Sequence, residues 1–187
     1  MLKPFLFALG ATGLIACTTT PISRVELVPL TSSQSLRANV SSAMVRTVSL
    51  PTYAAAEEVA VESPEGLITT NDTLLWADAP ERAATLAITR HLNQILSATI
   101  GPDPWPFIDL PDVSIEVRVE DMLARNDGTF QLRGQYFIGG DAIDYRPIVR
   151  SFDYEIPLSV ASPGGVATAQ SQALLALSED IAGSLSR

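Results

Sequence analysis

The sequence predicts a single α+β domain, in which a largely antiparallel sheet carries two amphipathic helices packed on it. Three runs in the second half alternate apolar and polar residues and are joined by short links, as consecutive antiparallel strands are. Two other runs repeat apolar residues at helical spacing, and their apolar faces need a sheet to cover them. The chain of 187 residues is 47% hydrophobic and 18% charged, which suits one folded core.

The first part of the chain predicts short strands separated by loops. Residues 24–28 and 44–48 alternate weakly, and residues 57–61 form a further strand-like piece. The serine-rich stretch 31–42 has no clear period, so we expect a loop there.

The first helix is predicted at residues 79–99. Asp78 followed three residues later by Glu81 imitates a capping box, and Pro80 falls in the first turn, where its missing N–H costs nothing. Gly101-Pro102 is expected to stop the helix. The apolar residues at helical spacing are Ala84, Ile88, Leu92 and Ile95.

The second half predicts a strand meander followed by a closing helix. Residues 113–119 alternate strictly, Asn126-Asp127-Gly128 supplies a tight turn, and residues 129–138 and 148–158 continue the alternation. After a break at Pro163-Gly164-Gly165, the closing helix is marked by apolar residues at helical spacing. These are Leu174, Leu177, Ile181 and Leu185.

The amino terminus predicts a lipoprotein signal peptide over residues 1–16. Lys3 precedes a short apolar segment, and Leu14-Ile15-Ala16-Cys17 resembles the bacterial lipobox. We expect lipidation of Cys17, the only cysteine, by fatty acyl chains such as palmitate, with residues 17–23 as a tether and 24–187 as the periplasmic domain. An ordinary signal peptide with an incidental cysteine, or a buried amino-terminal helix, is the alternative.

Charge and hydropathy exclude several classes of partner. Without residues 1–16 the chain has 11 arginines against 21 carboxylates, a formal charge of −10. So acidic a chain is a poor candidate for binding nucleic acid or anionic headgroups through a basic patch. No later apolar run reaches the roughly 18 residues of a membrane-spanning helix. We therefore expect the membrane to be reached through the lipid anchor alone.

Residues suited to catalysis or metal binding are few. His91 is the sole histidine, lies within the first predicted helix, and lacks a free cysteine partner once Cys17 is acylated. Glu116 and Glu120 could form a carboxylate pair, but a solvated strand face explains them better. Residues 139–144 carry two aspartates without the spacing of a calcium loop, and we interpret them as a surface turn. The sequence predicts no enzyme, no cofactor and no metal.

A proline-flanked aromatic pair, Trp105 and Phe107 in PDPWPF, is the one candidate binding feature. Three prolines make this loop stiff. The loop can hold its aromatic side chains over the core as a lid, or present them outward as anchors for a partner. Both interpretations remain open from the sequence.

The order of these motifs resembles a known family. The lipobox is followed by VSLPTY (residues 48–53), then LLWADAPERAATLAITRHLNQIL, then PWP, the meander and an Ala/Leu-rich final helix. Over residues 17–185 this series is similar to the PqiC/YmbA-type ABC-transport auxiliary lipoproteins of MCE-type lipid transporters.

The resemblance implies a non-enzymatic accessory subunit, anchored by lipid and facing the periplasm. Its partner would be a PqiB-like MCE-domain subunit of a system that carries lipid between the inner and outer membranes and supports membrane integrity. Thr18 after Cys17 agrees with sorting to the outer membrane, and family members assemble as homo-oligomeric rings. The alternative is an anchored accessory lipoprotein of another envelope machine, for secretion or outer-membrane assembly.

Overall fold

Three long strands form the largest part of the sheet. In the computed structural model, which describes residues 21–140 and 146–186, β7 (Val113–Ala124), β8 (Thr129–Gly139) and β9 (Ile148–Pro157) pair antiparallel in sequence order. The Arg125 N–H donates to the Thr129 carbonyl across the turn, and Gly128 takes the positive φ of 87° that the turn requires. The predicted meander is confirmed.

Short strands complete the sheet along the other edge of β7, and most of them run parallel. β2 (Ser42–Val45) pairs parallel with the start of β7 and with β6 (Thr99–Pro102), while β3 (Val61–Glu62) pairs parallel with the end of β7 and antiparallel with β4 (Ile68–Thr69). The α+β single-domain class is confirmed, but the seven-stranded sheet is mixed rather than largely antiparallel. Strands of two to four residues are too short for their periodicity to reveal partner or direction.

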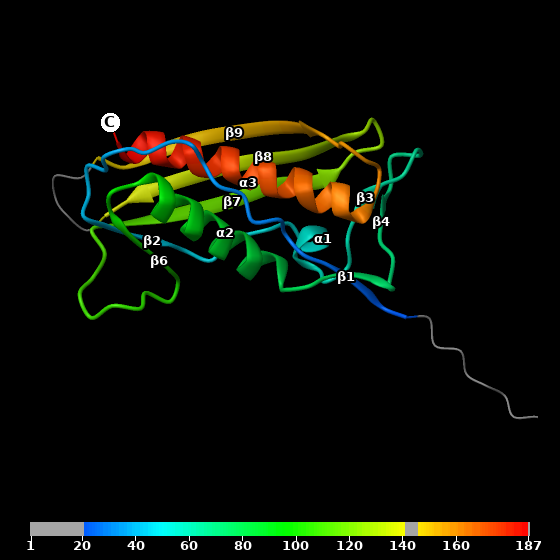
Figure 1. Cartoon of the computed structure of the whole chain (residues 1–187), viewed down its shortest axis with the longest axis horizontal. Coiled ribbons are helices and arrows are strands. Elements are labelled where there is room, and N and C mark those ends of the chain that lie inside the picture. The colour runs from blue at the N-terminus through cyan, green and yellow to red at the C-terminus, as the bar shows by residue number, and fades with distance from the viewer. Residues whose placement is uncertain (1–20, 141–145, 187) are drawn as a thin grey trace, which may run out of the picture.

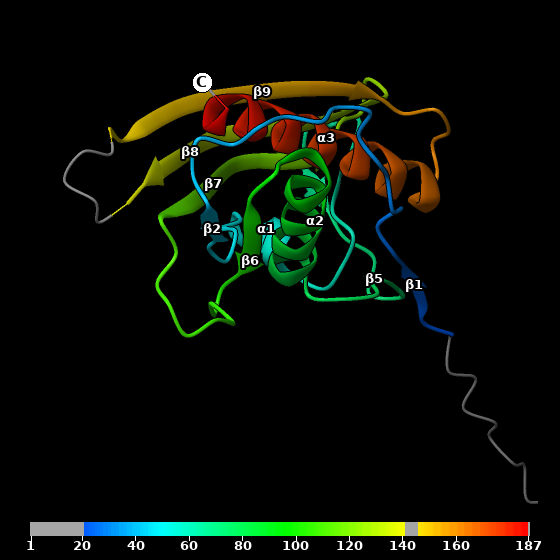
Figure 2. The same cartoon turned by 60° about the vertical axis from the view of Figure 1, so that its left-hand side comes forward.

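Two long helices cover one face of this sheet, as Figure 2 shows. α2 (Pro80–Ile95) and α3 (Pro163–Leu185) pack against each other, α3 against β8 and β9 and α2 against β2 and β6. A short third helix, α1 (Thr52–Ala55), follows Pro51. The helices and the sheet enclose one core, whose largest fully buried side chains include Ile88, Leu92, Phe130, Leu132, Tyr136, Leu174, Leu177 and Ile181.

The first long helix ends earlier than predicted. The Asn93 side chain donates to the Ile100 carbonyl at 2.8 Å and accepts from the Ile100 N–H at 3.1 Å. These two bonds turn the chain back along the helix, so that Gly101-Pro102 lies in β6 instead of terminating α2.

The starts of both long helices also differ from expectation. The N-cap of α2 is Ala79, without a side-chain cap, and Asp78 pairs with Arg82, so the predicted capping box does not form. Pro163-Gly164-Gly165 is the first turn of α3 and not a break before it, because the Ser162 hydroxyl accepts from the Gly165 N–H at 3.1 Å and caps the helix.

The chain between the first two strands crosses over both long helices (Figure 1). β1 (Ser23–Val25) pairs parallel with β5 (Leu74–Trp76) beside the sheet, and residues 26–41, the crossing segment, lead from there to β2. The segment is held by hydrogen bonds from Val28 N to Ser171 Oγ at 2.9 Å, from Leu36 N to the Ile95 carbonyl at 2.7 Å, and from Asn39 N to the Leu185 carbonyl at 2.8 Å. Its serine-rich part is a loop, as predicted.

The domain therefore has two distinct ends along its longest axis. β1, β4 and the first turn of α3 lie at one of them, the amino-terminal end, where the described chain begins (Figure 1). The loop between β6 and β7 lies at the opposite end, which we call the far end, as Figures 1 and 2 both show. Among the residues that the structure describes, no helix combines the length and hydropathy needed to cross a membrane.

Candidate docking surface

The loop of residues 103–112 at the far end has both of its ends fixed to the sheet. At the start, the Asp103 N–H donates to the Val45 carbonyl at 2.8 Å. At the end, Oδ2 of Asp112 accepts from the N–H groups of Ser41 and Ser42 at 2.7 and 3.0 Å. These bonds hold the loop by backbone groups of β2 and of the residue before it, so its conformation does not depend on a ligand.

Trp105 stiffens the inside of this loop. Its indole Nε1 donates to the Asp109 carbonyl at 2.6 Å, and its ring meets that of Phe107 edge-on with 4.9 Å between centroids. The ring also covers Gly101, where an added Cβ would lie 2.8 Å from it. Trp105 is therefore packed within the loop and against Gly101 of β6.

The outer side of the loop is apolar and exposed. Phe107 is 53% exposed, Leu110 is 81% exposed, and Ile108 is fully exposed. Together with the exposed Val149 of β9, these residues form what we call the far-end apolar surface. Phe107 was predicted from the sequence, but Ile108 and Leu110 were not; their signal is the three apolar residues around Asp109 between the two prolines of PFIDLP.

A shallow groove of about 520 Å³ adjoins this surface. Leu110, Phe137 and Val149 line it together with the side chain of Arg46. The guanidinium carbon of Arg118 lies 5.0 Å from the centroid of the Phe137 ring, so the aromatic face is partly occupied by a cation. Apolar side chains of a partner would pack on the far-end apolar surface and enter the groove beside it.

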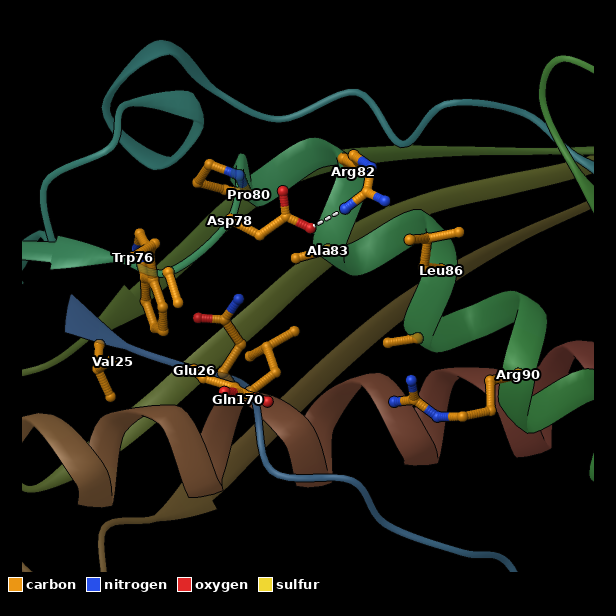
Figure 3. Close-up of a pocket in the computed structure, with 13 residues that line it drawn as sticks. Val25, Glu26, Trp76, Asp78, Pro80, Arg82, Ala83, Leu86, Arg90 and Gln170 are labelled. Carbon is orange, nitrogen blue, oxygen red and sulfur yellow. Dashed lines mark hydrogen bonds and ion pairs between the residues drawn. The ribbon is translucent and has the colours of Figure 1, made fainter.

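A second hollow, of about 470 Å³, lies between the crossing segment, α2 and the first half of α3 (Figure 3). Trp76 closes one end, Arg90 lies at the other, and the ion pair between Asp78 and Arg82 lies on the rim. The amide of Gln170 points up into the hollow from α3. The hollow therefore mixes apolar walls with polar groups of both charges.

Gln170 is the unusual residue of this second hollow. Only 2% of its surface is exposed, and no hydrogen bond joins its amide to another described residue. A buried amide prefers a partner, and a water molecule in the hollow can serve as one. The charges around it are nearly balanced, so this hollow selects for no particular ligand class.

His91 is a core residue and not part of a catalytic arrangement. Its Nδ1 lies 3.3 Å from Ser178 Oγ, and that hydroxyl already donates to the Leu174 carbonyl at 2.7 Å. Nδ1 therefore carries the proton and donates to Ser178, while the buried Nε2 has no hydrogen-bond partner among the described residues. Burial lowers the pKa of His91, and the Arg90 charge lowers it further.

The two glutamates considered as a carboxylate pair each form an ion pair on the surface. Glu116 forms an ion pair with Arg118 at 2.7 Å, and Glu120 with Arg133 at 3.9 Å, so each carboxylate faces a guanidinium and not the other carboxylate. Cys17 and residues 141–144 of the predicted surface turn lie outside the described residues. Within the ranges 21–140 and 146–186, no three histidine, cysteine or acidic side chains gather as metal ligands would.

Comparison with known proteins points to one family. The family model for the ABC-type transport auxiliary lipoprotein component matches residues 26–182. No protein of curated function matches the sequence. The fold resembles the crystal structure of protein XCC0632 from Xanthomonas campestris, of family model DUF330, with a TM-score of 0.69 and 16% identity over 86% of this chain and 94% of that one. It also resembles the crystal structure of an uncharacterized protein, with a TM-score of 0.65 and 17% identity over 88% of this chain and all of the other.

Proposed function

The chain belongs to the family of ABC-type transport auxiliary lipoprotein components, and from this premise we propose that it is the non-enzymatic accessory subunit of an MCE-type lipid transporter. In this proposal Cys17 carries the lipid anchor, the domain faces the periplasm from the outer membrane, and the partner is a PqiB-like MCE-domain subunit. The transporter would move lipid between the two membranes and support envelope integrity.

One observation carries the docking role: the far-end apolar surface lies at the end of the domain opposite the start of the described chain (Figure 1). Helix α3, which runs between the two ends, has 23 residues and is therefore about 34 Å long. The tether from Cys17 to Ser23, the first residue of β1, spans at most about 21 Å even when fully extended. An anchored domain that stands upright would thus hold Phe107, Ile108 and Leu110 away from its own membrane.

The chemistry of the surface suggests what the partner presents. Asp103, Asp109 and Asp112 flank the exposed apolar side chains, and the chain as a whole has a net charge of −9. A complementary site would be an apolar patch with a basic rim, since interfaces pair apolar centres and opposite charges. We propose that such a patch lies at the distal end of the MCE subunit, with several copies of this chain arranged around it as a ring.

Capture of the partner tests the proposal. Tagged full-length protein, extracted from envelopes in detergent, is expected to retain an MCE-domain subunit. The double variant Phe107→Ala with Ile108→Ala removes two exposed anchors, and its capture should fall by about tenfold or more if they are hot spots. Val28→Ala, which trims an exposed apolar side chain of the crossing segment and belongs to neither end of the domain, is the control and should bind normally.

The alternative outcomes are distinct. Capture of secretion or outer-membrane assembly components in place of an MCE subunit would favour the other envelope-machine role. Undiminished capture by the double variant would remove the far-end apolar surface from the docking site. A monomeric mass for the purified, detergent-solubilised protein at all concentrations would contradict the ring.

A further inference from the structure

The exposed large apolar side chains of this domain fall mostly into two groups at opposite ends. Phe107, Ile108, Leu110 and Val149 form the far-end apolar surface already described. The second group belongs to elements of the amino-terminal end: the chain before β1, the β3–β4 hairpin, and the link from β9 to α3 (Figure 1). It consists of Ile22, Leu67, Ile68 and Val160, with exposed fractions of 61%, 63%, 46% and 61%, and we call it the amino-terminal apolar cluster.

A groove lies between two of these elements, next to the cluster and lined by other residues. It has a volume of about 440 Å³ and runs between the β3–β4 hairpin and the start of α3. Val61 and Leu74 line one wall, and Leu158, Pro163 and Val166 line the other. Since Leu74 also pairs with Ser23 in the β1–β5 ladder, the groove connects the hairpin and α3 with the first strand of the domain. Exposed apolar side chains that gather at one end of a domain can mark a contact site.

The length of the tether limits how far the amino-terminal end can lie from the membrane. Ser23 is fixed to the domain, because its N–H donates to the Thr73 carbonyl at 2.8 Å. Ser23 lies six positions after Cys17, so a lipid on Cys17 holds Ser23 within about 21 Å of the bilayer. The amino-terminal end is therefore the part of the domain that meets the membrane most often.

We infer that the amino-terminal apolar cluster rests in the lipid surface and fixes the orientation of the domain on its membrane. This inference rests on the proposed anchor at Cys17, which brings the cluster to the bilayer. The anchor alone would leave the domain free to tilt. Leu67, Ile68 and Val160 add a second contact, and two weak membrane signals together hold a protein far more firmly than one.

Charge indicates which lipid surface suits this contact. Glu65, Asp72 and Asp127 are exposed on the turns that surround the cluster. The arginines of the same elements are engaged in ion pairs, Arg24 with Glu57 at 3.8 Å and Arg125 with Glu62 at 3.4 Å. Uncompensated carboxylates repel anionic headgroups, so the contact is apolar insertion into a zwitterionic surface and not electrostatic attachment.

The test measures the depth of single positions in the membrane. Full-length acylated protein is reconstituted into phosphatidylcholine vesicles that contain lipids with a spin-label quencher near the headgroup. Because Cys17 is acylated, a second cysteine is the only free thiol, and Leu67→Cys or Val160→Cys carries a fluorophore there. Ile108→Cys, which is fully solvent-exposed at the far end, is the control.

Quenching at positions 67 and 160 should exceed that at position 108 by about twofold or more, and should weaken when phosphatidylglycerol replaces much of the phosphatidylcholine. In a Leu67→Ser, Ile68→Ser background, quenching of the label at position 160 should fall as the domain tilts freely. Vesicle-bound protein with equal quenching at 67 and 108 overturns the inference but leaves the anchor intact. Protein that floats free of vesicles with an unmodified Cys17 overturns the anchor and this inference with it.

Discussion

The Tyr53 hydroxyl donates a hydrogen bond of 2.9 Å to Oδ1 of Asp121 and accepts one of 3.2 Å from the Met122 N–H. Asp121 also forms an ion pair with Arg125. Nη1 of Arg125 lies 3.4 Å from Oε1 of Glu62. These two hydrogen bonds of Tyr53 lie just after the irregularity in β7 between Val119 and Asp121. There the regular strand ladder, which would have provided hydrogen-bond partners, is interrupted. The tyrosine of the VSLPTY motif thus secures α1 to the middle of the sheet.

We expect Tyr53→Phe to lower the free energy of unfolding by about 1–3 kcal/mol, because it leaves Met122 N–H and a nearly buried carboxylate with one partner fewer. Urea denaturation of the purified domain measures the change. Thr52→Val, which removes an exposed hydroxyl from the same helix, should have almost no effect. Equal losses in the two variants would mean that the Tyr53 hydroxyl contributes nothing special.

His91 should make stability depend on pH. Its pKa is lowered in the folded protein, so between that value and the ordinary value near 6.5 the unfolded chain binds more protons. The stabilising contribution of neutral His91 is complete above pH 6.5 and is lost as the pH falls towards the folded pKa, by up to about 1.4 kcal/mol per pH unit. Unfolding curves between pH 7.5 and 5 should show this slope.

In His91→Gln the same slope should be shallower, and envelope function at neutral pH should persist, because the proposed function assigns no catalysis to the ring. Arg90→Gln should raise the folded pKa of His91, so that stability is lost over a narrower range of pH. An unchanged slope in His91→Gln would assign the pH dependence to other groups.

Two glycines of the same strand should respond differently to alanine. A Cβ at Gly134 would lie 2.2 Å from the Arg118 carbonyl oxygen and 2.9 Å from the Phe152 ring, so Gly134→Ala should cost about 2–3 kcal/mol through overpacking. At Gly139 an added Cβ meets nothing within 4 Å, and Gly139→Ala should be neutral or slightly stabilising. Thermal denaturation of both variants decides the matter, and equal melting temperatures would contradict the close contact of β7, β8 and Phe152.

Trp105 and Phe107 of the far-end loop should differ in how much each contributes to thermal stability. Trp105→Ala removes the bond to Asp109 and the cover over Gly101, so it should lower the melting temperature. Phe107→Ala exposes no new core and should leave the melting temperature within about 2 °C of the parent. The reverse order, with Phe107 the more costly, would show that Phe107 and not Trp105 supports the loop.

Cys17 is tested by metabolic labelling with a clickable fatty acid. Label on the parent protein should disappear in Cys17→Ser, and the variant should keep its signal segment, because cleavage of a lipoprotein precursor follows acylation. The chain has a net charge of −9, so its charge does not favour binding to anionic headgroups in place of the anchor. An unlabelled parent protein that is free in the periplasm would rule out the lipid attachment.

The sequence predicted the elements that are long enough to show a regular spacing of apolar residues. The meander β7–β8–β9 was recoverable because its strands have ten residues or more and Asn126-Asp127-Gly128 joins the first two. The parallel strands β2, β3 and β6 were missed or displaced, since two to four residues show no usable alternation and their partners lie far along the chain.

The docking loop was recoverable only in part. Tryptophan between prolines drew attention to Trp105 and Phe107, but the sequence could not say which aromatic faces inward. That is decided by Gly101, which leaves room for the indole ring, and by the Asp109 carbonyl that binds it. Once Trp105 turns inward, Ile108 and Leu110 are left on the outside.

The position of β2 between β6 and β7 has a consequence for how the protein is made. Ala43 of β2 pairs with Ile100 on one side and Val113 on the other, and both partners emerge from the ribosome long after β2 itself. Until then the early strand has no sheet to join, and such long-range closure is slow. The first hundred or so residues should therefore stay open while they are synthesised, which is the state in which a chain can still be threaded across a membrane before it folds.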